Sequence, residues 1–266
     1  MNFSFVDPWH LFLPRDGGHV VSLSGSGGKT SMLQVFAGQL AAEGVNTILT
    51  CTTRTEAVEG FKVFEWAELE KTDPEKLPAQ FYLRDGQTSE GKWLGLAPGN
   101  VDLLAERFPG RVILVEADGS ACMPLKYYRN GEPVWPQCTS LAVIVMSMAA
   151  VGEPAGEVVH RFTSEPFEPL KDLKSHSVWL WDHQLTLLTA AGGYLDQVPA
   201  DVPVVLTMTC MDQQDDSIGL FDFAGRAMTN ERLPLVVFCE TNGENSSFRT
   251  SCRRDDEDEG DGEVEG

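Results

Sequence analysis

A glycine-rich turn between residues 20 and 31 is the feature that most restricts what this chain can fold into. An apolar run at 20–23 leads into three glycines spread over 25–28, and Lys29-Thr30 follows at once. Glycine lets the backbone turn tightly enough for its N–H groups to converge on an anion, and a helix that starts next adds the positive end of its dipole. The order strand, loop, helix therefore predicts a phosphate-binding loop within an α/β fold.

Each residue of this loop has an expected role. Lys29 would reach the β- and γ-phosphates of a nucleotide, and the hydroxyl of Thr30 would ligate the accompanying magnesium. The usual pattern has a glycine six residues before the lysine, where this chain has Leu23, so the loop is a shortened variant like those of Mur ligases and MinD-like ATPases. The alternative is a glycine-rich turn with a chance Lys-Thr pair. We expect nucleotide binding by Gly25, Ser26, Gly27, Gly28, Lys29, Thr30 and Ser31.

Five further apolar runs predict the remaining strands of a sheet. They cover residues 45–50, 111–116, 141–146, 202–207 and 235–238, and helical patterns separate most of them. Buried strands that alternate with helices are typical of a doubly wound, mostly parallel sheet, here of the P-loop NTPase type. Ligands of such sheets bind at the carboxyl ends of the strands.

The same patterns predict the domain organisation. Residues 1–18 form an N-terminal segment, 19–241 the α/β domain, and 242–266 a disordered tail whose last twelve residues hold eight acids and no base. A small antiparallel insertion is expected at about 56–97. Helices are expected at 101–108 with Asn100 as the cap, from Asp182 to Thr189, and at 219–229.

An acidic pair follows the strand at 111–116. Glu116 and Asp118 lie two residues apart, so the alternation of a strand puts both side chains on the same side. A phosphate loop needs such a group nearby to hold magnesium and to orient the attacking water. We therefore expect Thr30, Asp118 and Glu116 to bind the metal, and Lys29, Glu116 and Asp118 to carry the chemistry; the alternative is that Asp118 only caps a turn.

Other polar residues leave their roles open. Thr52 and Thr53, at the end of the strand at 45–50, could complete the magnesium shell or touch the γ-phosphate, or they could simply be good strand-end residues. His160 and Arg161 could neutralise phosphate charge or form a solvated pair. The segment 209–212 ends in Asp212 where guanine-specific proteins carry Asn-Lys-x-Asp, but only the aspartate matches, so no guanine preference follows.

The cysteines are scattered without a Cys-x-x-Cys pair. Reduced, mostly buried thiols are the favoured interpretation, and a metal site formed by Cys51, Cys122 and Cys210 is the alternative.

Charge and hydropathy narrow the class of protein. The formal net charge is −20, and the chain without its acidic tail is still clearly acidic. This argues against broad contact with nucleic acid or anionic membrane. No apolar run approaches the ~20 residues needed to cross a bilayer, and the N-terminus lacks the pattern of a secretory signal. We expect a cytoplasmic protein with neither nucleic-acid nor membrane partners.

Taken together, six segments resemble one known family. They are Gly25–Thr30, Thr50–Thr53, Val115–Ser120 with Pro124–Lys126, Glu132–Pro136 and Val159–Arg161. In these segments the chain is similar to the YqeC family, which is described as selenium-dependent hydroxylase accessory proteins. The resemblance covers about residues 15–240, and the linked Glu-Ala-Asp-Gly and Pro-Leu-Lys motifs make it more specific than the loop alone.

The resemblance implies a nucleotide-binding accessory factor that acts on a molybdenum hydroxylase or its maturation factors, with Mg²⁺ and ATP or GTP as cofactors. It also implies that Lys126 is a functional lysine near the site, contacting phosphate or a carboxylate of a partner. The chain departs from the family at Phe162-Thr163, at 209–212 and beyond Cys239. Three functions follow as hypotheses: an NTP-hydrolysing accessory protein, a nucleotide-binding scaffold without turnover, or an enzyme related to Mur ligases.

Overall fold

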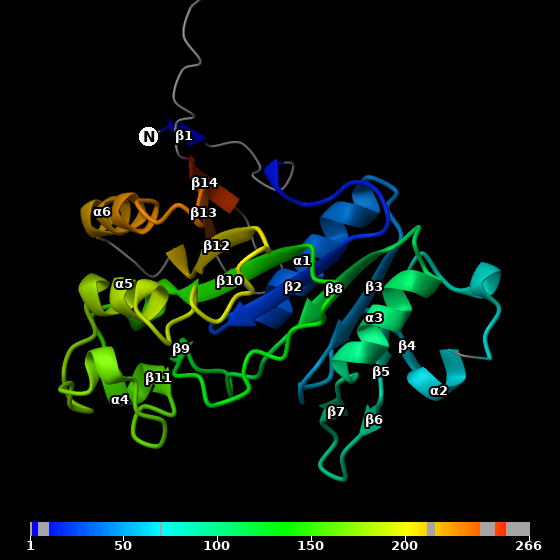
Figure 1. Cartoon of the computed structure of the whole chain (residues 1–266), viewed down its shortest axis with the longest axis horizontal. Coiled ribbons are helices and arrows are strands. Elements are labelled where there is room, and N and C mark those ends of the chain that lie inside the picture. Colours follow the sequence, from blue (N-terminus) through cyan, green and yellow to red (C-terminus); the bar gives the residue numbers. More distant parts are fainter. Residues whose placement is uncertain (1, 5–10, 70, 212–215, 240–247, 254–266) are drawn as a thin grey trace, which may run out of the picture.

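A ten-stranded sheet organises the described part of the chain (Figure 1). The computed structural model describes residues 2–4, 11–69, 71–211, 216–239 and 248–253. The strand order is β1-β14-β13-β12-β10-β2-β8-β3-β5-β4. These strands are β1 (Asn2–Ser4), β2 (Val20–Gly25), β3 (Thr47–Cys51), β4 (Lys62–Glu65), β5 (Gln80–Arg84), β8 (Val112–Glu116), β10 (Leu141–Ser147), β12 (Val204–Thr209), β13 (Leu235–Cys239) and β14 (Phe248–Arg253).

Eight neighbouring strands, from β13 to β4, run parallel, while β14 and β1 add antiparallel partners beyond β13. Parallel neighbours need crossover connections, and helices supply several of them. The helices are α1 (Lys29–Ala42), α2 (Trp66–Leu69), α3 (Pro98–Arg107), α4 (Ala155–Val158), α5 (Trp181–Thr189) and α6 (Ser217–Ala227). Figure 1 shows α5 and α6 toward one end of the sheet and α2 and α3 toward the other. The predicted doubly wound α/β fold is confirmed.

Both faces of the sheet are buried, which explains the continuous apolar runs in the sequence. Successive residues of β2 point to opposite faces: Val21 packs in the core that includes Phe36 of α1, whereas Val20 packs in the core that includes Leu104 of α3. On β10, Ile144 belongs to a third core that α5 and α6 cover. The carboxyl ends of β2 and β8 are left free to carry polar side chains.

Antiparallel pairing in the insertion is narrower than the sequence predicts. It covers the short pair β6 (Gly86–Gln87) and β7 (Trp93–Leu94), and Trp93 also makes an isolated antiparallel bridge with Thr55. The other two stretches of the insertion, β4 and β5, instead extend the main sheet in parallel. A second small sheet pairs β9 (Leu125–Lys126) with β11 (Val159–His160) in parallel.

Helix starts also differ from the sequence prediction. The helix expected at 101–108 begins at Pro98 with Ala97 as its cap, so Asn100 lies in the first turn and does not cap it. Asp182 likewise lies inside the first turn of α5, whose cap position is Leu180. Six residues of the predicted disordered tail form β14, which corrects that prediction for 248–253. The rest of the predicted tail, 242–247 and 254–266, lies outside the described residues, as does Asp212. Among the residues described, no helix has both the length and the apolar character needed to cross a membrane.

Candidate functional site

The loop between β2 and α1 is shaped by its glycines. Gly25 has φ +98° and Gly27 φ +79°, values that side chains rarely allow. A Cβ on Gly25 would lie 2.2 Å from the carbonyl oxygen of Val145, and one on Gly27 would lie 2.4 Å from Cβ of Ser147. The loop therefore packs directly against the end of β10. Its position is fixed further by Ser26, whose N–H donates to the carbonyl of Val145 at 2.8 Å.

Helix α1 begins at Lys29 without a side-chain cap. Gly28 occupies the cap position and has no side chain to satisfy the first N–H groups of the helix. The start of α1, which includes Thr30 and Ser31, therefore presents N–H groups and the positive end of the helix dipole beside the loop. This is the arrangement that binds an anion such as phosphate.

The ammonium group of Lys29 is almost fully buried, with 2% of the side chain exposed. It donates to the carbonyl oxygen of Gly25 at 2.7 Å and lies 3.1 Å from Oδ1 of Asp118. Oε1 of Glu116 is 3.8 Å away, and the hydroxyl of Ser120 accepts a longer hydrogen bond of 3.4 Å. The predicted lysine thus contacts both predicted carboxylates.

Glu116 lies at the end of β8 and accepts two hydroxyl hydrogen bonds. Its Oε2 is 3.2 Å from Oγ1 of Thr30 and 3.3 Å from Oγ1 of Thr55. Burial raises the pKa of this carboxyl, and the nearby charge of Lys29 opposes the rise. The hydroxyl and carboxylate expected to share a metal ion are therefore already adjacent.

Asp118 connects the loop to a second lysine. Its Oδ2 accepts the N–H of Gly25 at 2.9 Å and lies 3.2 Å from Nζ of Lys126. Both charged side chains are fully buried. Burial lowers the pKa of Lys126, while the charges of Asp118 and Glu132 act in the opposite direction. The buried pair fixes the position of Asp118 beneath the loop.

A line of alternating charges continues from Lys126 away from the loop. Nζ of Lys126 is 3.0 Å from Oε2 of Glu132, and Glu132 receives two hydrogen bonds from the guanidinium of Arg161, at 2.6 and 3.0 Å. Burial would raise the pKa of Glu132, but the hydrogen bonds from Arg161 and the charge of Lys126 outweigh it and hold the pKa at about 2. Arg161 is therefore joined to the loop through four other side chains of alternating charge, ending at Lys29.

The sequence model of the YqeC protein family matches residues 21–163, more than half of the chain. The chain belongs to the YqeC family. An uncharacterized protein YqeC of Escherichia coli (strain K12) is 34% identical over 171 residues, which cover 60% of this chain and 65% of that protein. The chain thus spans less than two thirds of the length of this relative.

The matched YqeC span contains the whole constellation, from Gly25 of the loop to Arg161 at the far end of the charged line. Two other predicted residues, Thr52 and His160, lie outside the direct contacts of Lys29. The hydroxyl of Thr52 donates to the carbonyl of Val134 at 2.8 Å, so it is engaged away from the loop lysine. His160 lines a neighbouring cavity. Thr53 follows Thr52 at the end of β3, and its buried hydroxyl has no hydrogen-bond partner within the described part of the structure.

Sequence reasoning missed three contributors to this YqeC site. Thr55 reaches Glu116, Glu132 joins Lys126 to Arg161, and the hydroxyl of Thr209 donates to the carbonyl of Gly27. Thr55 belongs to the same threonine-rich segment as Thr52. The sequence therefore pointed to this segment, but it did not show which threonine reaches Glu116. Glu132 stands in one of the family segments, whereas nothing in the sequence singled out Thr209.

The cysteine alternative gains no support within the residues described, where no three His, Cys, Asp or Glu side chains gather in a way that could hold a metal ion. Burial raises the pKa of the Cys51 thiol to about 12, which keeps it protonated, while Cys122 is exposed.

Proposed function

We propose that this YqeC-family chain binds magnesium with ATP or GTP and hydrolyses the nucleotide while it assists the maturation of a selenium-dependent molybdenum hydroxylase in the cytoplasm. The observation that supports nucleotide binding is the meeting of Lys29, Thr30, Glu116 and Asp118 at the carboxyl ends of two adjacent strands. Ligands of doubly wound sheets bind at this edge. The hydroxylase, or its maturation factors, is the partner that the resemblance to the family implies.

The residues present suit magnesium and phosphate. A hydroxyl and a carboxylate 3.2 Å apart, from Thr30 and Glu116, are the oxygen ligands that magnesium prefers. The uncapped start of α1 leaves N–H groups for phosphate oxygens. Thr30, Glu116 and Asp118 would hold the metal, which would supply neutralisation of phosphate charge.

The side chains of the site have separate tasks in this proposal. Lys29 and the loop N–H groups bind and orient the phosphates, which is most of what phosphoryl transfer requires of a protein. Glu116 orients the attacking water through its carboxylate. Asp118 keeps Gly25 and Lys126 in place through its second oxygen.

Calorimetry with the purified chain tests the nucleotide part. We expect binding of ATP or GTP that requires magnesium, with slow release of phosphate, and we expect Lys29→Ala to abolish both. Lys171→Ala, which changes an exposed lysine far along the chain, is the matched control and should bind as the unaltered protein does. Absence of magnesium-dependent binding, or equal binding by Lys29→Ala, would overturn the proposal; binding without phosphate release would favour the nucleotide-binding scaffold.

The partner is tested separately. The full chain is used as bait in an extract of its native cell, with and without a non-hydrolysable nucleotide. We expect a molybdenum hydroxylase or one of its maturation factors to be retained in only one of the two conditions. Retention of other proteins alone would reject the accessory role but leave nucleotide binding intact.

A further inference from the structure

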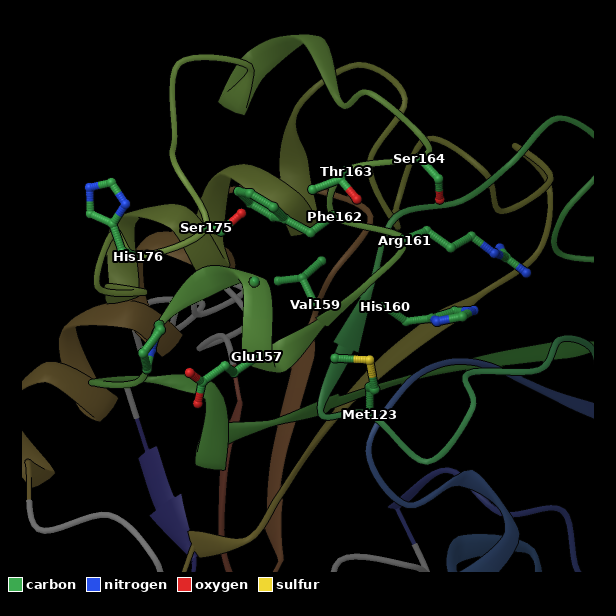
Figure 2. Close-up of a pocket in the computed structure, with 12 residues that line it drawn as sticks. Met123, Glu157, Val159, His160, Arg161, Phe162, Thr163, Ser164, Ser175 and His176 are labelled. Atoms are coloured by element: carbon green, nitrogen blue, oxygen red, sulfur yellow. The ribbon is translucent and has the colours of Figure 1, made fainter.

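A cavity of about 610 Å³ lies next to the charged line, with Arg161 in its wall. Its walls include Met123, His160, Arg161, Phe162 and His176. Figure 2 shows His160 and Arg161 extending from adjacent positions toward the same side, with Val159 and Phe162 supplying apolar surface. The volume falls in the range of small-molecule sites, and the mixture of apolar walls with a few polar groups is typical of them.

The charged line holds one more cation than carboxylates. The carboxylate of Glu132 contacts Lys126 at 3.0 Å, Arg129 at 2.9 Å and Arg161 at 2.6 Å. With Lys29 included, these four cations face three carboxylates, those of Glu116, Asp118 and Glu132. The carboxylate in the cavity lining, Glu157, is exposed. This excess of one positive charge lies in a chain whose formal net charge is −20.

These cations also affect the neighbouring His160. The pKa of His160 is lowered, first by burial and then by the charges of Arg161 and Lys126. A neutral imidazole at this position keeps one N–H to donate.

Arg161 is held ready for a ligand. Three of the five guanidinium donors bond to Glu132 and to the carbonyl of Tyr127, which leaves two donors without an acceptor among the described residues. The backbone of Arg161 has φ +65°, a conformation that costs about 1 kcal/mol for a residue with a side chain. The two hydrogen bonds to Glu132 fix the plane of the guanidinium, so little side-chain entropy remains to be lost on binding.

We propose that this cavity binds a small organic anion, a carboxylate or a phosphate monoester, that carries an apolar group. The anionic end contacts Arg161 and His160, and the apolar group packs on Phe162 and Met123. The two adjacent donors suit a planar or tetrahedral oxyanion, which a guanidinium recognises well. The cavity adjoins the phosphate loop, because the hydroxyl of Ser26 donates to the carbonyl of the wall residue Met123 at 2.7 Å. The proposed contacts are made by Arg161 and His160 and not by Lys29, so the proposal does not rest on nucleotide binding.

Histidine NMR locates the site directly, because two of the five histidines line the cavity. Phenyl phosphate is titrated into the full chain, and benzamide serves as the uncharged probe. We expect saturable shifts of the ring signals of His160 and His176 with phenyl phosphate, at concentrations up to about 10 mM for so small a probe. His19 and His183, outside the lining, should not move, and benzamide should bind far more weakly.

Two arginine variants test whether Arg161 contacts the phosphate group of the probe. Arg161→Gln should weaken phenyl phosphate binding about tenfold, the loss expected of a hydrogen bond to a charged group. Arg129→Gln is the matched control: Arg129 contacts the same Glu132 but does not line the cavity, so its affinity should stay within about twofold by the same reasoning. Phe162→Ala tests the apolar wall if Arg161→Gln fails to fold. Unmoved His160 and His176 signals, equal binding of benzamide, or equal losses in the two arginine variants would overturn the proposal.

Discussion

Nζ of Lys126 lies 3.2 Å from Oδ2 of Asp118, and neither side chain has any exposed surface. Two opposite charges buried together gain a strong Coulomb attraction but also lose their hydration, so the pair by itself adds little net stability. The lowered pKa of Lys126 agrees with this, since burial outweighs its two carboxylate neighbours. What the pair provides is position: it holds the carboxylate of Asp118 against the N–H of Gly25.

Loss of one member of this pair should therefore be costly. Lys126→Met keeps most of the side-chain volume but leaves Asp118 and Glu132 short of a cation. We expect the free energy of unfolding to fall by about 3 kcal/mol or more, the cost of an uncompensated buried charge. Urea denaturation measures this change in the free energy of unfolding. Lys171→Met, at an exposed ion pair, is expected to change stability little, and an equally small effect of Lys126→Met would contradict the prediction.

The steric role of the loop glycines can be separated from their backbone role. Gly27 and Gly44 both have positive φ, but a Cβ on Gly27 would meet Ser147 and Pro124 while one on Gly44 would meet nothing within 4 Å. Gly44→Ala should cost about 1 kcal/mol from the backbone alone. Gly27→Ala should cost about 2 kcal/mol more, because the neighbouring backbone must shift. Thermal or urea unfolding of the two variants measures these costs. Equal losses of unfolding free energy would show that the loop tolerates a side chain at Gly27.

The charged line predicts a pH dependence. In the folded chain the pKa of Glu132 is about 2, below its ordinary value of 4.5. Its ionised form therefore stabilises the fold above pH 4.5, by about 3 kcal/mol, and this contribution disappears as the pH falls through 2. The difference in unfolding free energy between the unaltered chain and Glu132→Gln should be largest near neutral pH.

This difference should narrow steadily in acid. Unfolding by urea at several pH values between 7 and 2 follows it. Glu168→Gln, which alters an exposed ion pair, serves as the control and should show no comparable trend. A difference that stays constant down to the lowest pH would mean that Arg161 and Lys126 do not stabilise the ionised carboxylate.

The central strands and the loop could be predicted because short-range signals agreed. Apolar residues, glycines and Lys29-Thr30 came in an order that has few structural solutions, and the alternation of a strand placed Glu116 and Asp118 on one side. The structure brings these residues into contact. Their roles in binding and hydrolysis stay predictions.

Strand direction could not be predicted from alternation alone. β4 and β5 show the same residue pattern whether they pair parallel or antiparallel. The informative feature was the length of the link between them, residues 66–79, which contains α2 and is long enough for a crossover. The start of α3 had a signal too, since Pro98 suits the first helical position better than Asn100 suits a cap.

Register and distance explain the remaining misses. Thr55 lies three residues beyond Thr52, and only the path of the chain after β3 decides which hydroxyl reaches Glu116. Thr209 lies 182 residues from Gly27, with no local pattern to connect them. Contacts of this kind come from the packing of β12 beside β10, which a single sequence does not reveal.

The tucked position of Lys29 has a consequence for any anion that reaches the loop. The three N–H donors of its ammonium group already face the carbonyl of Gly25, Oδ1 of Asp118 and the hydroxyl of Ser120, so an incoming phosphate has to displace one of these acceptors. Where Asp118 is displaced, the exchange releases a carboxylate oxygen at the same moment. Binding of an anion in the loop is therefore coupled to release of the Asp118 carboxylate from Lys29.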